Sequence, residues 1–212
     1  MSEATFCPDC TLCPRLASFL AKTRHAHPDY HCKPVSPFGE ARPKLLIVGL
    51  APGMHGANRT GRPFTGDYAG ILLYQSLFEL GLSSAPTSVD RDDGLRLIGA
   101  RITNAVKCLP PDNKPEPSEI RTCNRYLAAE FLELTSVRAV LALGTVAHDA
   151  TLVANGLKRS AAKFGHGNEH PLPGERLMVD SYHCSRYNTN TRRLTPEMFR
   201  TVLKRAATLA GL

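Results

Sequence analysis

The chain has 212 residues, of which 42% are hydrophobic, and a formal net charge of +7. This size fits one globular domain over residues 1–212, and no apolar run approaches the roughly 20 residues that would cross a bilayer. The polar N-terminal segment lacks the apolar stretch of an export signal, so we expect a cytoplasmic protein without a membrane partner. The positive charge suits a polyanionic partner but does not identify it.

Strand and helix patterns alternate along the chain after an expected N-terminal helix at 16–24. Strands are expected at 44–50, 100–106, 137–144 and 176–183, and helices at 69–82, 119–134, 145–156 and 195–211. Ser118 and Thr195 are expected to cap the second and the last of these four helices. The polar segments 25–43 and 158–174 indicate surface loops. The alternation predicts an α/β fold with a central parallel four-stranded sheet and helices on both faces.

The first expected strand leads into a glycine-rich stretch, "GLAPGMHGANRTGRPFTGD", which runs from Gly49 to Asp67. Glycines let a backbone approach a ligand closely. The stretch has neither the G-x-G-x-x-G spacing of a dinucleotide loop nor the lysine and spacing of a P-loop. Ligands of open α/β sheets bind beyond the carboxyl ends of the strands, so the segments after all four strands should meet in one crevice.

Four of the seven cysteines have a spacing typical of a metal site. Cys10 and Cys13 form a C-x-x-C pair, and Cys108 and Cys123 flank a proline-rich loop. Four thiolates can hold zinc or an iron–sulfur cluster, and the spacing does not separate the two. Cys7 is a rival ligand because it forms a second C-x-x-C pair with Cys10, and ordinary buried cysteines are the alternative.

Polar and aromatic side chains follow the ends of the expected strands. They are Phe64, Asp67, Asn104, Asn113, His183, Arg186 and Asn188. A nucleobase pocket requires an aromatic platform, amides that read a hydrogen-bonding edge, an imidazole that can donate and a carboxylate. Each residue also has a structural explanation when taken alone; Asp67, for example, can cap the helix that follows it.

Four motifs together closely resemble the type-b uracil-DNA glycosylases, family 5 of that superfamily. They are "GLAPGMHGANRTGRPFTGD", "NAVKCLPPDNKPEP", "LALG" and "SYHCSRYNTNTRRLTPEMF". The resemblance implies a three-layer α/β/α sandwich in which Phe64 stacks on a flipped-out base. It implies catalytic roles for Asp67, Asn113 and His183. It also implies a [4Fe–4S] cluster on Cys10, Cys13, Cys108 and Cys123, with zinc as the less expected occupant.

The implied activity is hydrolysis of the N-glycosidic bond of uracil, hypoxanthine or ethenocytosine in double-stranded DNA. We expect a monomer, associated with the nucleoid in a prokaryote, that forms no Schiff base and leaves an abasic site. Substrate contacts are expected from the Gly49–Gly53 turn, whose backbone N–H groups can donate, and from Asn104, Arg186 and Asn188.

Two other functions stay open at this point. One is a type-a glycosylase limited to uracil, although that class has an acidic residue where this chain has Leu50. The other is a cluster-bearing DNA-binding module without enzymatic activity. Met54 and Cys184 also depart from the residues usual in the family, and Met54 is expected to narrow the pocket.

Overall fold

A computed structural model describes residues 6–212 of the protein. Residues 1–5, part of the segment inspected for an export signal, lie outside the described residues. A six-stranded sheet in the order β1-β3-β2-β4-β6-β5 forms the centre. Its four inner strands are parallel, as expected from the sequence: β2 (Leu45–Gly49), β3 (Ala100–Asn104), β4 (Ala139–Leu143) and β6 (Arg176–Ser181).

The two outer strands correct the sequence-based expectation of four strands. β1 (Phe38–Gly39) and β5 (Glu169–Leu172) pair antiparallel with β3 and β6 in segments that were expected to be loops. β1 has only two residues, and β5 contains a proline, which is tolerated at a sheet edge. The segment at 25–43 is also not wholly superficial, because Cys32 and Val35 are buried in it.

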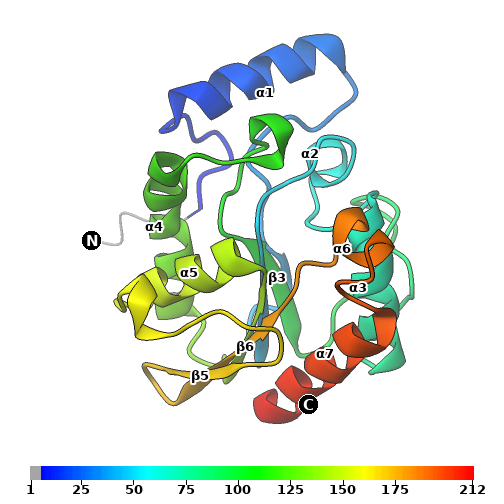
Figure 1. Cartoon of the computed structure of the whole chain (residues 1–212). Coiled ribbons are helices and arrows are strands. Elements are labelled where there is room, and N and C mark those ends of the chain that lie inside the picture. The colour runs from blue at the N-terminus through cyan, green and yellow to red at the C-terminus, as the bar shows by residue number, and fades with distance from the viewer. Residues whose placement is uncertain (1–5) are drawn as a thin grey trace.

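Helices cover both faces of the sheet (Figure 1). α3 (Tyr68–Glu79) and α7 (Pro196–Ala210) pack on one face, and α4 (Pro117–Glu133) and α5 (Thr145–Ala154) pack on the other. All five residues of β2 are buried, since both faces of a parallel sheet are covered. Among the described residues, no helix is long and apolar enough to cross a membrane.

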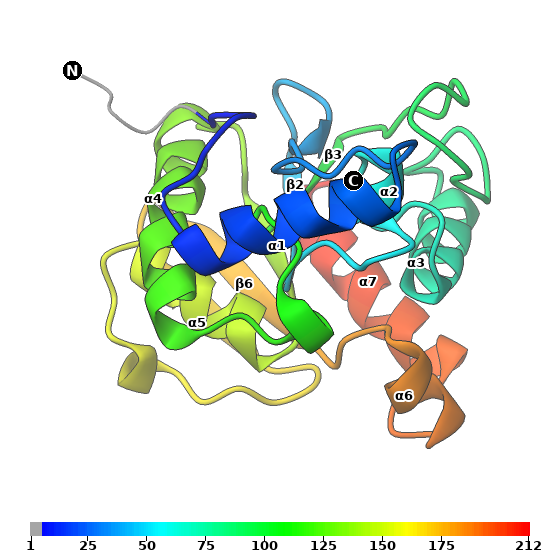
Figure 2. The ribbon, with the colours of Figure 1, turned by 90° about the horizontal axis from the view of Figure 1, so that it is seen from above.

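α1 (Pro14–Ala26) lies across the end of the molecule where β2 and β3 finish (Figure 2). Two short helices, α2 (Ala57–Thr60) and α6 (Arg186–Asn190), and two 3-10 turns, at Pro111–Asn113 and Arg159–Ala161, lie within the connecting loops. The loops at the carboxyl ends of the strands therefore carry the predicted motifs, as expected for an open α/β sheet.

The helix starts follow the local sequence. The hydroxyl of Thr195 accepts a hydrogen bond from the backbone N–H of Met198, which confirms it as the cap of α7. The prediction that Ser118 caps the helix expected at 119–134 was wrong: this helix, α4, begins earlier, with Glu116 as its cap. Pro117 suits the first helical position, and the carboxylate of Glu119 reaches back to the backbone N–H of Glu116 at 2.7 Å.

Candidate active site

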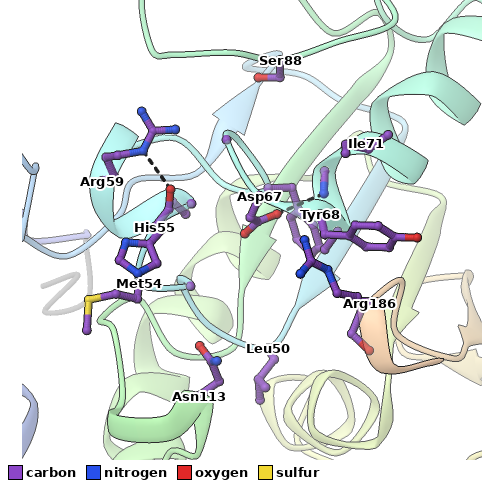
Figure 3. A pocket seen from close by; sticks show the side chains of 18 of the residues that line it. Leu50, Met54, His55, Arg59, Asp67, Tyr68, Ile71, Ser88, Asn113 and Arg186 are labelled. Carbon is purple, nitrogen blue, oxygen red and sulfur yellow. Dashed lines mark hydrogen bonds between the residues drawn. The ribbon is translucent and has the colours of Figure 1, made fainter. Parts of the chain in front are cut away.

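A cavity of about 970 Å³ lies at the carboxyl ends of β2 and β3. Figure 3 shows side chains that line it. Most of the residues predicted from the sequence line it: Gly53, Phe64, Asp67, Asn104, Asn113, His183 and Arg186. The glycine-rich stretch, the proline-rich loop and the segment after β6 therefore meet in one place. Gly49 and Asn188 are not among the lining residues and have supporting positions, described below.

The aromatic platform of the cavity is Phe64. Its ring is largely buried and stacks on the ring of His183, with centroids 5.9 Å apart and planes at 29°. Gly49 makes room for this ring, because a Cβ there would lie 2.6 Å from the Phe64 ring and 2.5 Å from Oδ1 of Asn104. Gly49 thus contributes by its lack of a side chain.

The backbone of Phe64 is held in the left-handed region, with φ of 53°. Such a conformation costs a non-glycine residue on the order of 1–3 kcal/mol and requires support from its surroundings. The hydroxyl of Tyr74 donates to the carbonyl of Pro63 at 3.0 Å, and the buried guanidinium of Arg62 pairs with Asp93 at 2.7 Å. The first turn of α3 also packs against the carbonyl of Phe64 at Gly70.

Gly70→Ala should therefore destabilise the protein. A Cβ at Gly70 would lie 1.8 Å from the backbone oxygen of Phe64, which cannot move without moving the platform. We expect a loss of about 2–3 kcal/mol in the free energy of unfolding, measured by denaturant titration. Gln75→Ala, on the exposed side of the same helix, is the control and should change stability little. Equal stability of the two variants would contradict this account of the packing.

Asp67 has both of the roles considered for it in the sequence. Its Oδ1 accepts a hydrogen bond from the backbone N–H of Gly70 at 3.1 Å, which makes it the N-cap of α3. Its Oδ2 lies against Gly56, where a Cβ would come within 2.2 Å. Burial raises the pKa of the carboxyl group above its usual value, although the backbone hydrogen bonds oppose this shift. One oxygen is thus used structurally, while the carboxylate faces the cavity (Figure 3).

His183 is a neutral imidazole in this environment. Burial lowers the pKa of the ring to about 4, so the charged form is not populated near pH 7. A neutral imidazole has one N–H that can donate a hydrogen bond into the cavity. Asn188 holds the preceding backbone, because its amide donates to the carbonyl of His183 at 2.8 Å. The predicted binding residue Asn188 is therefore placed as a support of His183.

The two cavity asparagines come from opposite ends of one loop. Asn104 ends β3, is only 3% exposed, and its Oδ1 is buried without a hydrogen-bond partner among the described residues. A buried polar atom in this state is costly unless a ligand satisfies it. Asn113 is exposed at the end of the Pro111–Asn113 turn, with φ of 55°. Asparagine tolerates this left-handed conformation better than most residues.

The rim of the cavity contains residues that the sequence reasoning missed. His55 lines it, with Nδ1 2.9 Å from the hydroxyl of Tyr30, and the side chain of Arg59 donates to the carbonyl of His55 at 2.8 Å. On the other side, the guanidinium of Arg186 lies 5.1 Å from the centre of the Tyr68 ring (Figure 3). The signal was present in the motif, since His55 and Arg59 stand inside the glycine-rich stretch.

Leu50, Met54 and Cys184, which the sequence analysis singled out, have different positions. Leu50 and Met54 line the cavity, so both can affect which ligand fits it. Cys184 is fully buried in the core behind His183 and is not a lining residue. Lys107 also lies outside the cavity: its ammonium is buried against Glu130, at 2.5 Å, and Thr103. The described lining residues include no lysine.

A second, small cavity brings together the four predicted cysteine ligands, Cys10, Cys13, Cys108 and Cys123. Leu16 and Tyr126 contribute apolar walls. Cys7 is exposed and does not line this cavity, which places it outside the candidate ligand set.

Burial makes three of these thiols, those of Cys13, Cys108 and Cys123, poor acids in the absence of a cation. It raises the pKa of Cys13 to about 11, with a further contribution from Cys123, and it raises the pKa of Cys108 and Cys123. The backbone N–H of Lys107 donates to Sγ of Cys123 at 3.3 Å, a contact that supports a thiolate. Four cysteines that line one small, mostly apolar cavity fit a metal centre that supplies the missing positive charge.

Comparison with known proteins identifies the family. The family model described as "Uracil DNA glycosylase superfamily" matches residues 36–207. The type-5 uracil-DNA glycosylase of Thermus thermophilus is 50% identical over 208 residues, which cover 96% of this chain and 94% of that protein. The type-5 enzyme of Pyrobaculum aerophilum is 44% identical over 207 residues, covering 96% and 90%. The type-4 enzyme of Thermotoga maritima is 32% identical over 148 residues, covering 69% and 67%. The chain therefore belongs to the uracil-DNA glycosylase superfamily and, within it, to the type-5 enzymes.

Proposed function

We propose that the protein hydrolyses the N-glycosidic bond of uracil and related damaged bases in double-stranded DNA. The observation that carries this proposal is the cavity in which Asp67 and His183 accompany a stacking platform and the unpartnered Oδ1 of Asn104. A base inside a duplex cannot reach such a cavity, so the nucleotide must be flipped out of the stack. Family membership and the basic rim support the same substrate.

The base is read and activated on one side of the cavity. Phe64 stacks on its face, and Oδ1 of Asn104 accepts from an N–H of its edge, which satisfies the buried oxygen. The neutral imidazole of His183 donates to a base oxygen as negative charge develops there. Donors that are fixed before the reaction stabilise such charge without reorganisation.

The sugar is stabilised on the other side. The bond breaks through an oxocarbenium-like state, and the carboxylate of Asp67 opposes the positive charge on the sugar. Asp67 and Asn113 position the water that adds to the sugar and completes hydrolysis. Because no lysine is among the described lining residues, we propose a monofunctional enzyme that leaves an abasic site.

The remaining substrate contacts come from the rim. Arg59 and Arg186 lie on opposite sides of the opening and suit the phosphates that flank the flipped nucleotide. Uracil and hypoxanthine present the same neighbouring carbonyl and N–H to Asn104, so one pocket can accept both. We propose a single-domain monomer that acts in the cytoplasm, at the nucleoid.

A [4Fe–4S] cluster is the proposed occupant of the cysteine site, held by Cys10, Cys13, Cys108 and Cys123. A single tetrahedral zinc with bonds of about 2.3 Å requires sulfur atoms about 3.8 Å apart. Among the described residues, no three cysteine sulfurs lie within 4.8 Å of one another, which suits the larger cluster better. The cluster would supply positive charge and a structural tie between α1, α4 and the loop after β3.

Asn104→Ala tests the reading of the base. Uracil and hypoxanthine each lose a hydrogen bond to Oδ1, so their cleavage rates should fall about 10- to 100-fold. Ethenocytosine has no N–H at the corresponding position, and its rate should fall much less. Single-turnover rates on three duplexes measure this difference. An equal fall for all three bases would indicate a structural role for Asn104.

The function itself is tested with a duplex that contains one U·G pair. Incubation followed by alkali should cut the uracil strand, and strand integrity before alkali should show that no lyase step occurs. Parallel duplexes carry hypoxanthine and ethenocytosine. Cleavage of uracil alone would narrow the substrate range and point to Met54. A folded, DNA-binding protein that cuts none of them would favour the non-enzymatic alternative.

A further inference from the structure

Three residues on the α4–α5 face of the sheet form a buried cluster that the proposed reaction does not use. They are His148 of α5, His170 of β5 and Asp180 of β6. The side chains of His148 and Asp180 are 1% and 0% exposed, and that of His170 is 12% exposed. None of the three lines the candidate active site or the cysteine cavity.

The three side chains present ligand atoms to one point. Nδ1 of His148 lies 2.8 Å from one oxygen of Asp180, and Nε2 of His170 lies 2.9 Å from the other. One ligand atom from each residue lies within 4.8 Å of the other two. Around a single tetrahedral ion with bonds of about 2.0–2.2 Å to nitrogen and oxygen, neighbouring ligand atoms are about 3.3–3.6 Å apart, within the 4.8 Å spread of this cluster.

The contacts of His148 also allow a neutral ring that binds a cation. Nε2 of His148 lies 3.2 Å from the carbonyl of Ala162, which can only accept, and Nδ1 faces the carboxylate of Asp180. Without a cation, both ring nitrogens donate only if His148 is an imidazolium that forms a buried ion pair with Asp180. A neutral His148 satisfies both contacts if Nδ1 binds a cation and Nε2–H donates to Ala162.

The surroundings have the arrangement usual around metal ligands. A ligating histidine commonly donates its other N–H to a backbone carbonyl, and Ala162 provides one for His148. The backbone N–H of Gly165 donates to the second oxygen of Asp180 at 3.2 Å, which orients the carboxylate. We propose that His148, His170 and Asp180 form a binding site for a divalent transition-metal ion of the zinc class, with water as a fourth ligand.

The ion would fasten a loop to the sheet. The segment between α5 and β5 already contacts β6 through Gly167, whose N–H donates to the carbonyl of Asp180 at 2.8 Å. α5, β5 and β6 lie together on this side of the molecule (Figure 1). Asp180 precedes His183 by three residues, so a metal here would stabilise the segment that positions the catalytic imidazole.

Zinc counting on the holoprotein tests the proposal. The cluster-loaded protein is stripped with a chelator, equilibrated with zinc and dialysed, and its zinc and iron are measured together. We expect about one zinc per chain in the wild type, and an affinity at least about 100-fold weaker in His170→Gln, since loss of an outer partner alone costs about 10- to 100-fold. Cobalt should give visible bands without thiolate charge transfer.

His166→Gln is the matched control, because His166 is a half-buried histidine of the same loop that bonds to the backbone N–H of Tyr182. It should bind zinc like the wild type. Added zinc should raise the melting temperature of the wild type and of this control, but not that of His170→Gln. The proposal is overturned if the wild type keeps its iron but binds no zinc, or if His170→Gln binds zinc as tightly as the wild type does. Either result holds whatever the stability of the variants.

Discussion

Replacing Asp67 by asparagine should remove most of the glycosylase activity and leave the fold intact. Loss of a charge that stabilises the transition state costs on the order of 10²- to 10³-fold in rate. Asparagine caps helices about as well as aspartate, so the hydrogen bond from the backbone N–H of Gly70 can be kept. Single-turnover rates on a U·G duplex and denaturant titration measure the two properties in the same protein.

The sign of the stability change follows from the pKa of Asp67. Burial raises it above 3.8, so protonation favours the folded state. This stabilisation of the folded state is present below the unfolded-state pKa and is lost as pH rises through the raised pKa of the folded state. At neutral pH the charged carboxylate of Asp67 therefore adds no stability. Asp67→Asn should therefore be at least as stable as the wild type at pH 7.

Asp67→Ala separates the two roles of the residue. It should be as inactive as Asp67→Asn but about 1 kcal/mol less stable, because the cap of α3 is lost. If the asparagine variant keeps near-normal activity, Asp67 is a helix cap and the proposed reaction lacks its carboxylate.

The fall in rate at low pH should reflect protonation of Asp67, and not protonation of a histidine that has its ordinary pKa. The rate is expected to fall as pH drops through the raised pKa of the Asp67 carboxyl group. His183, with a pKa of about 4, stays neutral from pH 5 upward and adds no step near pH 6.5. A fall in rate as pH rises above 6.5 that disappears in His183→Asn would show that the imidazole acts in its charged form.

The sequence allowed the inner sheet and most of the cavity to be predicted. β2 is buried on both faces, so its sequence is an unbroken apolar run that can be recognised as a strand. β1 and β5 are partly exposed edge strands, and their sequences contain no such run. The residues of the cavity follow strand ends, and the topology of a parallel sheet brings strand ends together.

The rest depended on contacts between distant segments. The hydroxyl of Tyr30 contacts His55, 25 positions later in the chain. No sequence pattern at either residue predicts this contact. That Oδ1 of Asn104 lacks a hydrogen-bond partner among the described residues becomes clear only when all the atoms around it are placed. The cluster of His148 and Asp180 likewise joins a helix to a strand 32 positions later.

Cys108→Ser should remove the proposed cluster and lower activity without unfolding the sheet. We expect iron to fall from about four atoms per chain to a small fraction and the brown colour to be lost. The loop between β3 and α4 carries Cys108 near its start and Asn113 further on, so loss of the tie displaces Asn113. A displacement of about 1 Å can cost about 100-fold in rate.

The rest of this region has independent support, which makes the experiment decisive. The guanidinium of Arg15 bonds to both oxygens of Glu119 at 2.8 Å, and Leu16 and Leu20 pack in a core with Tyr126, so α1 stays attached to α4 without a metal. Cys7→Ser is the matched control, because Cys7 is exposed and outside the cysteine cavity; it should keep its iron and its activity. Iron lost from Cys7→Ser but kept by Cys108→Ser would reassign the ligands. Full activity in iron-free Cys108→Ser would show that the loop holds Asn113 in place by its own packing.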